Sequence, residues 1–151
     1  MRSKIEVKEL EAQSVSTVVE TEFSAFLGWP ACLDNRNRAP DRTVVYAVWS
    51  QTAFPRLNGM SNILYIGSTL RLGGPTDGCR LYSYRYSPQR HALGIRTRAA
   101  LLVNAGGVLS LRWTLVSDEL SARLKEEQLL ERHLTEHWEL PPFNGRRTNQ
   151  L

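Results

Sequence analysis

Two short segments rich in β-branched and aromatic residues, 43–49 and 62–67, constrain the fold of this chain most strongly. Residues of this kind favour strands that are buried on at least one face. The connection between the two segments contains Pro55 and the dipeptide Asn58-Gly59, which favours a tight turn. The segments therefore predict an antiparallel hairpin with a long connection.

Periodicity and termination signals predict the elements around this hairpin. Apolar residues recur at helical spacing over 13–27, and residues 4–10 alternate as in an edge strand or an extended arm. The order of elements predicts an α/β fold, a small three-stranded and mainly antiparallel sheet flanked by helices, with an additional N-terminal helix. The remaining expected elements are a third strand at 108–116 and helices at 80–86, 91–104 and 118–138.

The length and composition fit one compact domain. The chain has 151 residues, of which 42% are hydrophobic, and this is enough for a core. Within that domain we expect two parts. Residues 1–42 form the N-terminal helix and a polar loop (33–42) that pack on the core, and residues 43–151 form the main body.

The charge and the cysteine content indicate which class of partner and which cellular compartment to expect. Nineteen Lys and Arg against fifteen Asp and Glu give a net charge of +4, and arginine outnumbers lysine. A basic excess is compatible with a polyanionic partner, and the planar guanidinium suits phosphate. Cys32 and Cys79 lack CxxC spacing, and no apolar run has the length of a signal-peptide core or a membrane span. We therefore expect a cytoplasmic protein with free thiols and no membrane association.

A cluster of hydroxyl and guanidinium groups is expected at one end of the hairpin. Gly67 ends the second strand shortly after Tyr65. The Gly-rich run 73–78 then delays the next helix, which begins at Arg80 and places Tyr84 one turn later. These side chains should converge near the end of one strand. Such groups suit phosphate chemistry better than they suit a hydrophobic core.

These residues resemble the motifs of the GIY-YIG nucleases, and the resemblance covers about residues 43–146. Val44-Val45-Tyr46 stands where that family has Gly-Ile-Tyr, and Tyr65-Ile66-Gly67 matches Tyr-Ile-Gly. The further matching positions follow in the family's order: Arg80, Tyr84, a glutamate on the last helix, and Asn144 after a proline-rich turn.

The chain also departs from the family's pattern. The connections before and after the second strand are extended, and no lysine follows Gly67, where Ser68 and Arg71 stand instead. Arg71 is therefore an alternative to Arg80 as the arginine of the site. Only Arg80 has a tyrosine four residues later.

The resemblance implies a divalent-metal-dependent endonuclease that hydrolyses phosphodiester bonds in DNA, with RNA left open as a substrate. A glutamate would hold Mg²⁺ or Mn²⁺, and Arg80 would stabilise the charge of the transition state. Tyr65 is the expected general base with Tyr46 as its hydrogen-bond partner, and the reverse assignment stays open. Tyr84 and Asn144 would position the phosphate and the hydrogen bonds of the site.

The choice of the metal-binding glutamate rests on its surroundings in the last helix. Glu126 has apolar residues at +3 and +4, as the family's helix does. Glu127 lies nearer the middle of the helix's apolar stripe, and Glu131 has a shorter spacing to Asn144. We expect Glu126 to be the ligand and keep the other two as alternatives.

Basic and aromatic side chains around this cluster are compatible with backbone contacts to nucleic acid. A solvated helix face explains the arginines nearly as well, and His91 fits either a phosphate contact or a surface residue. The Gly-rich run lacks the lysine of a P-loop and predicts a flexible loop near the site. Specificity would come from the N-terminal helix, the 33–42 loop, the Gly-rich run, a homodimer or a separate partner. The residues expected to contact nucleic acid are Gly67, Arg71, Arg85, Arg90 and His91.

Two other functions remain open. One is a nucleic-acid-binding module of the same fold with weak or lost cleavage. The other is a zinc peptidase, because residues 133–137 read HxxEH and place His133 and His137 on one helix face. Only fourteen residues follow His137 to supply a third ligand, and histidine is favoured near a helix end. We therefore favour a structural role for these histidines.

Overall fold

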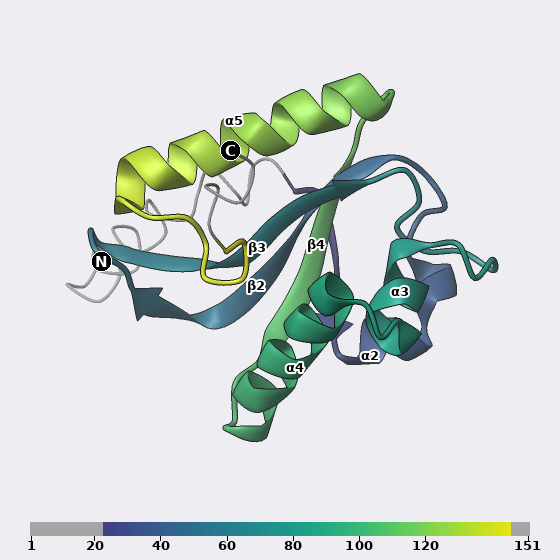
Figure 1. Ribbon diagram of the computed structural model, residues 1–151, viewed down its shortest axis with the longest axis horizontal. Coiled ribbons are helices and arrows are strands. Elements are labelled where there is room, and N and C mark those ends of the chain that lie inside the picture. The colour runs from purple at the N-terminus through teal and green to yellow at the C-terminus, as the bar shows by residue number, and fades with distance from the viewer. Residues whose placement is uncertain (1–22, 146–151) are drawn as a thin grey trace, which may run out of the picture.

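A four-stranded antiparallel sheet forms the centre of the fold in the computed structural model, which describes residues 23–145 (Figure 1). The strand order is β1-β4-β2-β3, so β1 and β3 are the edges. The expected α/β class and antiparallel pairing are confirmed, but the expected count of three strands was wrong. The strands are β1 (Ala25–Trp29), β2 (Val44–Pro55), β3 (Met60–Thr69) and β4 (Leu109–Leu115).

The hairpin of β2 and β3 is longer than the sequence suggested. Val44 pairs with Thr69 at one end, and Pro55 pairs with Met60 at the other. The expected long connection is therefore mostly strand, and the turn itself is confined to residues 56–59. Gly59 has a φ of 71°, a conformation that glycine adopts without steric cost.

Strand β1 begins within the last residues of the expected 13–27 helix, so the helix prediction was wrong for residues 25–27. Its residues pair with β4, for example Phe26 with Arg112, and exposure alternates along it until the buried Trp29. A short apolar segment of this kind fits a strand as well as a helix turn, and pairing with a distant strand decided between them. The expected helix residues 13–22 and the expected arm at 4–10 lie outside the described residues.

Helices cover both faces of the sheet (Figure 1). Successive residues of β2 point to opposite faces, so Val45 and Ala47 pack towards α5 (Glu119–His137), whereas Tyr46 and Val48 pack towards the other helices. Three of the helices begin and end within one or two residues of the expected positions. The helices on the second face are α2 (Ala31–Asp34), α3 (Arg80–Tyr86) and α4 (Arg90–Asn104). No described helix has the length and apolar character to cross a bilayer.

The start of the Gly-rich run 73–78 packs on the polar loop, whereas residues 75–78 are exposed. The Gly73 amide donates to Pro40 O and the Gly74 amide donates to Arg36 O, each at 2.9 Å. A Cβ on Gly73 would lie 2.2 Å from Arg36 O, so this approach of two backbones requires glycine. The polar loop begins in the last turn of α2 and contains a 3₁₀ turn, Arg36–Arg38, which gives the run a folded surface to pack on.

Candidate functional site

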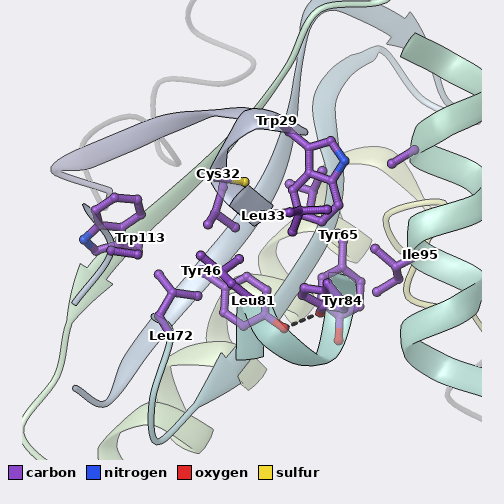
Figure 2. Close-up of a cluster of buried hydrophobic side chains, with 14 of the residues drawn as sticks. Trp29, Cys32, Leu33, Tyr46, Tyr65, Leu72, Leu81, Tyr84, Ile95 and Trp113 are labelled. Atoms are coloured by element: carbon purple, nitrogen blue, oxygen red, sulfur yellow. Dashed lines mark hydrogen bonds between the residues drawn. The ribbon is translucent and has the colours of Figure 1, made fainter. Parts of the chain in front are cut away.

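Three tyrosine side chains, from two strands and one helix, lie together in the buried cluster on the α3 and α4 side of the sheet (Figure 2). Tyr46 from β2 and Tyr84 from α3 are fully buried, and a hydrogen bond of 2.5 Å joins their hydroxyls. Tyr65 from β3 lies beside them, with its ring centroid 5.9 Å from that of Tyr46. The structure therefore brings the three expected tyrosines into one cluster.

Gly67 provides the space in which this cluster lies. A Cβ at this position would be 2.6 Å from Tyr65 Cε2 and 2.9 Å from the Tyr46 hydroxyl. The two rings thus lie over the bare backbone of β3. Gly67, which the sequence placed among the nucleic-acid contacts, has a packing role that accounts for it here.

Arg80 places a positive charge next to the tyrosine hydroxyls. It is the first residue of α3, and its amide is held by Arg71 O at 2.8 Å. The electrostatic interaction with Tyr46 is the main cause of a raised pKa for the guanidinium, and partial burial opposes it. The buried Nε of Arg80 has no hydrogen-bond partner among residues 23–145. The guanidinium thus lies close to the three tyrosine hydroxyls and to Glu126.

The tyrosines are neutral at physiological pH. Burial is the largest cause of a raised pKa for each of the three hydroxyls. For Tyr65, the proximity of Tyr46 and then of Glu126 raises the pKa further. A neutral tyrosine in this cluster can therefore accept a proton from a water molecule only if it passes its own hydroxyl proton to a neighbouring group.

His91 is such an acceptor for Tyr65. Its Nε2 lies 3.2 Å from the Tyr65 hydroxyl, and its ring centroid is 5.6 Å from the Tyr65 ring. The imidazole stands in the first turn of α4 and is exposed to solvent. Partial burial, followed by the charge of Arg80, lowers the pKa of His91, which favours the neutral imidazole that accepts a hydrogen bond. The sequence suggested a phosphate contact or a surface residue for His91, and the structure pairs it with Tyr65.

Glu126 reaches the cluster from α5, the helix on the other face of the sheet. Its Oε1 accepts a hydrogen bond of 2.6 Å from Ser68, the residue after Gly67. Glu126 is half-buried, whereas Glu127 and Glu131 are both exposed. Of the three glutamates considered from sequence, Glu126 is therefore the one beside the tyrosines and Arg80.

A single carboxylate can take part in holding a hard divalent ion. The described residues contain no group of three or more His, Cys, Asp or Glu side chains placed to hold a metal. Mg²⁺ does not require such a cage, because it keeps several waters and is commonly bound through one or two carboxylates together with substrate phosphate. The Glu126 carboxylate, oriented by Ser68, fits a hydrated Mg²⁺ or Mn²⁺ of this kind.

A groove of about 490 Å³ opens next to the cluster. Ser68, Arg71 and Arg80 line one part of it, and Glu119 and Arg123 from α5 line another. Arg71 and Arg123 are oriented by ion pairs with Asp41 at 3.2 Å and with Glu119 at 2.8 Å. A phosphate-bearing chain in this groove would thus lie among guanidinium groups.

Three of the expected site residues contact neither the tyrosine hydroxyls nor the groove. Asn144 Oδ1 accepts from the Ile66 amide at 3.0 Å, and its Nδ2 donates to Ile66 O at 2.8 Å. Asn144 therefore pairs with the backbone of edge strand β3 and stabilises the strand that carries Tyr65. Arg85 forms an ion pair of 3.1 Å with Asp34 of α2, and Arg90 is exposed at the start of α4.

The HxxEH histidines connect the end of α5 to the β2–β3 hairpin. His133 Nε2 lies 3.0 Å from Ser61 Oγ, and its Nδ1 lies 2.8 Å from Glu139 O. His137 Nδ1 lies 2.9 Å from Asn58 O. Because both ring nitrogens of His133 are in hydrogen bonds, zinc ligation would require one of these bonds to break.

Sequence reasoning missed two contacts of the site. The Tyr65–His91 hydrogen bond joins residues 26 positions apart, and no local pattern indicates it. Arg123 was also missed, although it stands one helical turn before Glu126 and so lies on the same face of α5. Comparisons with protein-family models, curated proteins and solved structures found no match.

Proposed function

We propose that the protein is a divalent-metal-dependent endonuclease that hydrolyses phosphodiester bonds in DNA. One observation carries this proposal: the Arg80 guanidinium lies among three tyrosine hydroxyls, beside the Glu126 carboxylate and an open groove. Such a set of groups provides a cation for phosphate, a hydroxyl for proton transfer and a ligand for a metal. The resemblance of residues 43–146 to GIY-YIG nucleases supports the same function.

In this proposal the guanidinium groups of the groove bind the substrate. Arg71 and Arg123 are held by carboxylates and face the groove, so they can contact phosphates on either side of the scissile bond. Arg80 contacts the scissile phosphate itself. Because it is partly buried and held by α3, its charge is already in place when negative charge builds up in the transition state.

Tyr65 and His91 transfer the proton of the attacking water. A water molecule attacks the phosphorus, and its proton passes to the Tyr65 hydroxyl while the hydroxyl's own proton passes to His91 Nε2. The bond between phosphorus and the 3′ oxygen breaks, and that oxygen takes a proton from solvent. Tyr65 is favoured over Tyr46 as the base, because Tyr46 is fully buried and its hydroxyl contacts Tyr84. An ion held by Glu126 would neutralise charge on the phosphate and stabilise the leaving oxygen.

A nucleic-acid-binding module without cleavage is the second candidate. The observation in its favour is the raised pKa of all three tyrosines, since none of them is a phenolate at neutral pH. In such a protein the guanidinium groups would bind the backbone and no proton would be transferred.

Plasmid nicking with matched glutamate variants tests the proposal. Wild type should convert supercoiled DNA to nicked or linear forms with Mg²⁺ or Mn²⁺ and not with EDTA. Glu126→Gln and Arg80→Ala should each lower the rate by about 100-fold or more. Glu127→Gln removes the same charge from an exposed position one residue away and should leave the rate unchanged.

The outcomes separate the two candidates. Equal rates for wild type and Arg80→Ala would show that the nicking comes from a contaminant and would overturn the proposal. Binding of DNA without metal-dependent nicking would favour the binding module.

A further inference from the structure

Four side chains stack in a row on the outer side of α3, away from the tyrosine cluster. The Arg36 guanidinium lies 4.9 Å from the Tyr82 ring centroid, and the Tyr82 and Tyr86 centroids are 4.8 Å apart. The Arg85 guanidinium lies 5.1 Å from the Tyr86 ring. Tyr86 is nevertheless 56% exposed, so much of its ring remains open to solvent.

A depression of about 350 Å³ lies beside Tyr86. Its other lining residues come from the end of α2 and the chain just after it, and they include Asn35, Asn37 and Arg38. These side chains offer amide donors and acceptors together with a guanidinium. The volume lies in the range of small-ligand sites, which is about 300–1,000 Å³. A planar, polar ligand suits this lining better than an aliphatic one.

The walls of this depression are held in place before any ligand binds. Arg36 donates to Gly74 O at 3.2 Å and pairs with Asp77 at 3.1 Å, which ties the lining loop to the Gly-rich run. Asp34, which also lines the depression, is neutralised by Arg85 at 3.1 Å. Preorganised walls of this kind reduce the entropy cost of binding.

We propose that this depression binds an unpaired nucleobase of the DNA substrate, stacked on the ring of Tyr86. Every base has a π-face that can stack on an aromatic ring, and the amides of Asn35 and Asn37 can pair with its polar edge. Arg38 is placed to contact the adjoining phosphate. In an intact duplex the faces of a base are covered by its neighbours, so the ligand is a single-stranded or locally unpaired nucleotide.

The position of α3 joins this subsite to the groove. Arg80 lines the groove at the first residue of the helix, and Tyr86 lines the depression at its last. Six residues of helix separate their Cα atoms by about 9 Å. One strand can therefore contact both, with one or two nucleotides between the unpaired base and the scissile phosphate. This geometry rests on the nuclease function proposed above.

Fluorescence anisotropy with a labelled single-stranded DNA oligonucleotide, in EDTA, tests the subsite without requiring cleavage. Tyr86→Ala should raise the dissociation constant by about 5- to 100-fold, the loss typical of removing one base–aromatic stack. Tyr86→Phe keeps the ring and should bind within twofold of wild type. Phe26→Ala removes a comparably exposed ring, 65% accessible, from the side of the sheet near Trp49 and should have no effect.

Four results would overturn the assignment. They are a change below twofold for Tyr86→Ala, an equal loss for Tyr86→Phe, an equal loss on a duplex of the same sequence, or Tyr86-dependent binding of RNA but not of DNA. Melting temperatures of the variants show whether each one folds.

Failure of the subsite and failure of the nuclease proposal give different results. If wild type nicks plasmid but Tyr86 does not affect single-strand binding, only the subsite is wrong. If Tyr86 affects binding but wild type does not nick, only the nuclease function is wrong.

Discussion

Tyr46 lies directly opposite Gly67 in the β2–β3 ladder, and its hydroxyl lies 2.9 Å from the position that a Cβ on Gly67 would occupy. The absence of a side chain at Gly67 therefore leaves room for the Tyr46 ring of the neighbouring strand. Tyr65, two residues earlier on β3, uses the same space. The geometry of the candidate site thus depends on one missing methyl group.

Replacing Gly67 by alanine should damage both the fold and the site. The new Cβ would overlap Tyr65 Cε2 at 2.6 Å, and shifting the two buried rings should cost about 1–3 kcal/mol of unfolding free energy. Gly94→Ala is the matched control, because Gly94 lies within α4 and a Cβ there meets nothing within 4 Å. That variant should be more stable by about 0.5–1 kcal/mol, since alanine favours a helix interior. Urea unfolding measures both, and equal effects would contradict this interpretation of Gly67.

Replacing His91 by glutamine should change the pH profile of DNA cleavage. Only neutral His91 can accept the Tyr65 proton, and its lowered pKa keeps it neutral to below its ordinary value. The wild-type rate should therefore fall only at acidic pH, below that value. The variant should be slower by about 100-fold at neutral pH and should lack this acid limb.

The groups that face His91 are Tyr65, Tyr84 and Arg80, and none of them titrates near this pH range. Leu93→Ala, an exposed change on the same helix, should keep the wild-type profile. An unchanged acid limb in His91→Gln would rule out His91 as the proton acceptor.

His133 should make the stability of the fold depend on pH. Burial is the main cause that lowers its pKa to about 4, whereas in the unfolded chain the value is about 6.5. The unfolded chain thus binds more protons at mildly acidic pH, so stability present above pH 6.5 is lost as pH falls towards 4. The total loss should be at most roughly 3 kcal/mol.

Urea unfolding of wild type and His133→Asn between pH 7.5 and pH 4.5 measures this dependence. The variant should be less stable at neutral pH, because the bonds to Ser61 and Glu139 O change, but it should show a flatter slope. The charged groups near His133 are His137, Arg56 and Glu139, which both proteins share. Equal slopes would show that the pH dependence comes from another group.

Local patterns predicted most of the elements. The β2–β3 hairpin and the helices α3, α4 and α5 follow from runs of β-branched residues, helical spacing and turn residues, all of which act within a few residues. These signals also place Tyr65, Arg80 and Tyr84 near one strand end. Strand β1 was missed, because five apolar residues carry little periodicity and their partner, β4, lies about 80 residues further along the chain.

Tertiary packing determines which of several neighbouring side chains reaches the candidate site. Glu126 and Glu127 differ by about 100° around α5, so the orientation of that helix on the sheet turns the first towards Ser68 and leaves the second in solvent. The Tyr65–His91 bond depends in the same way on how α4 packs beside β3. The residue types needed for phosphate chemistry could be recognised from the order of the chain alone. Which of them meet depends on contacts between distant segments, and those contacts have no local signature.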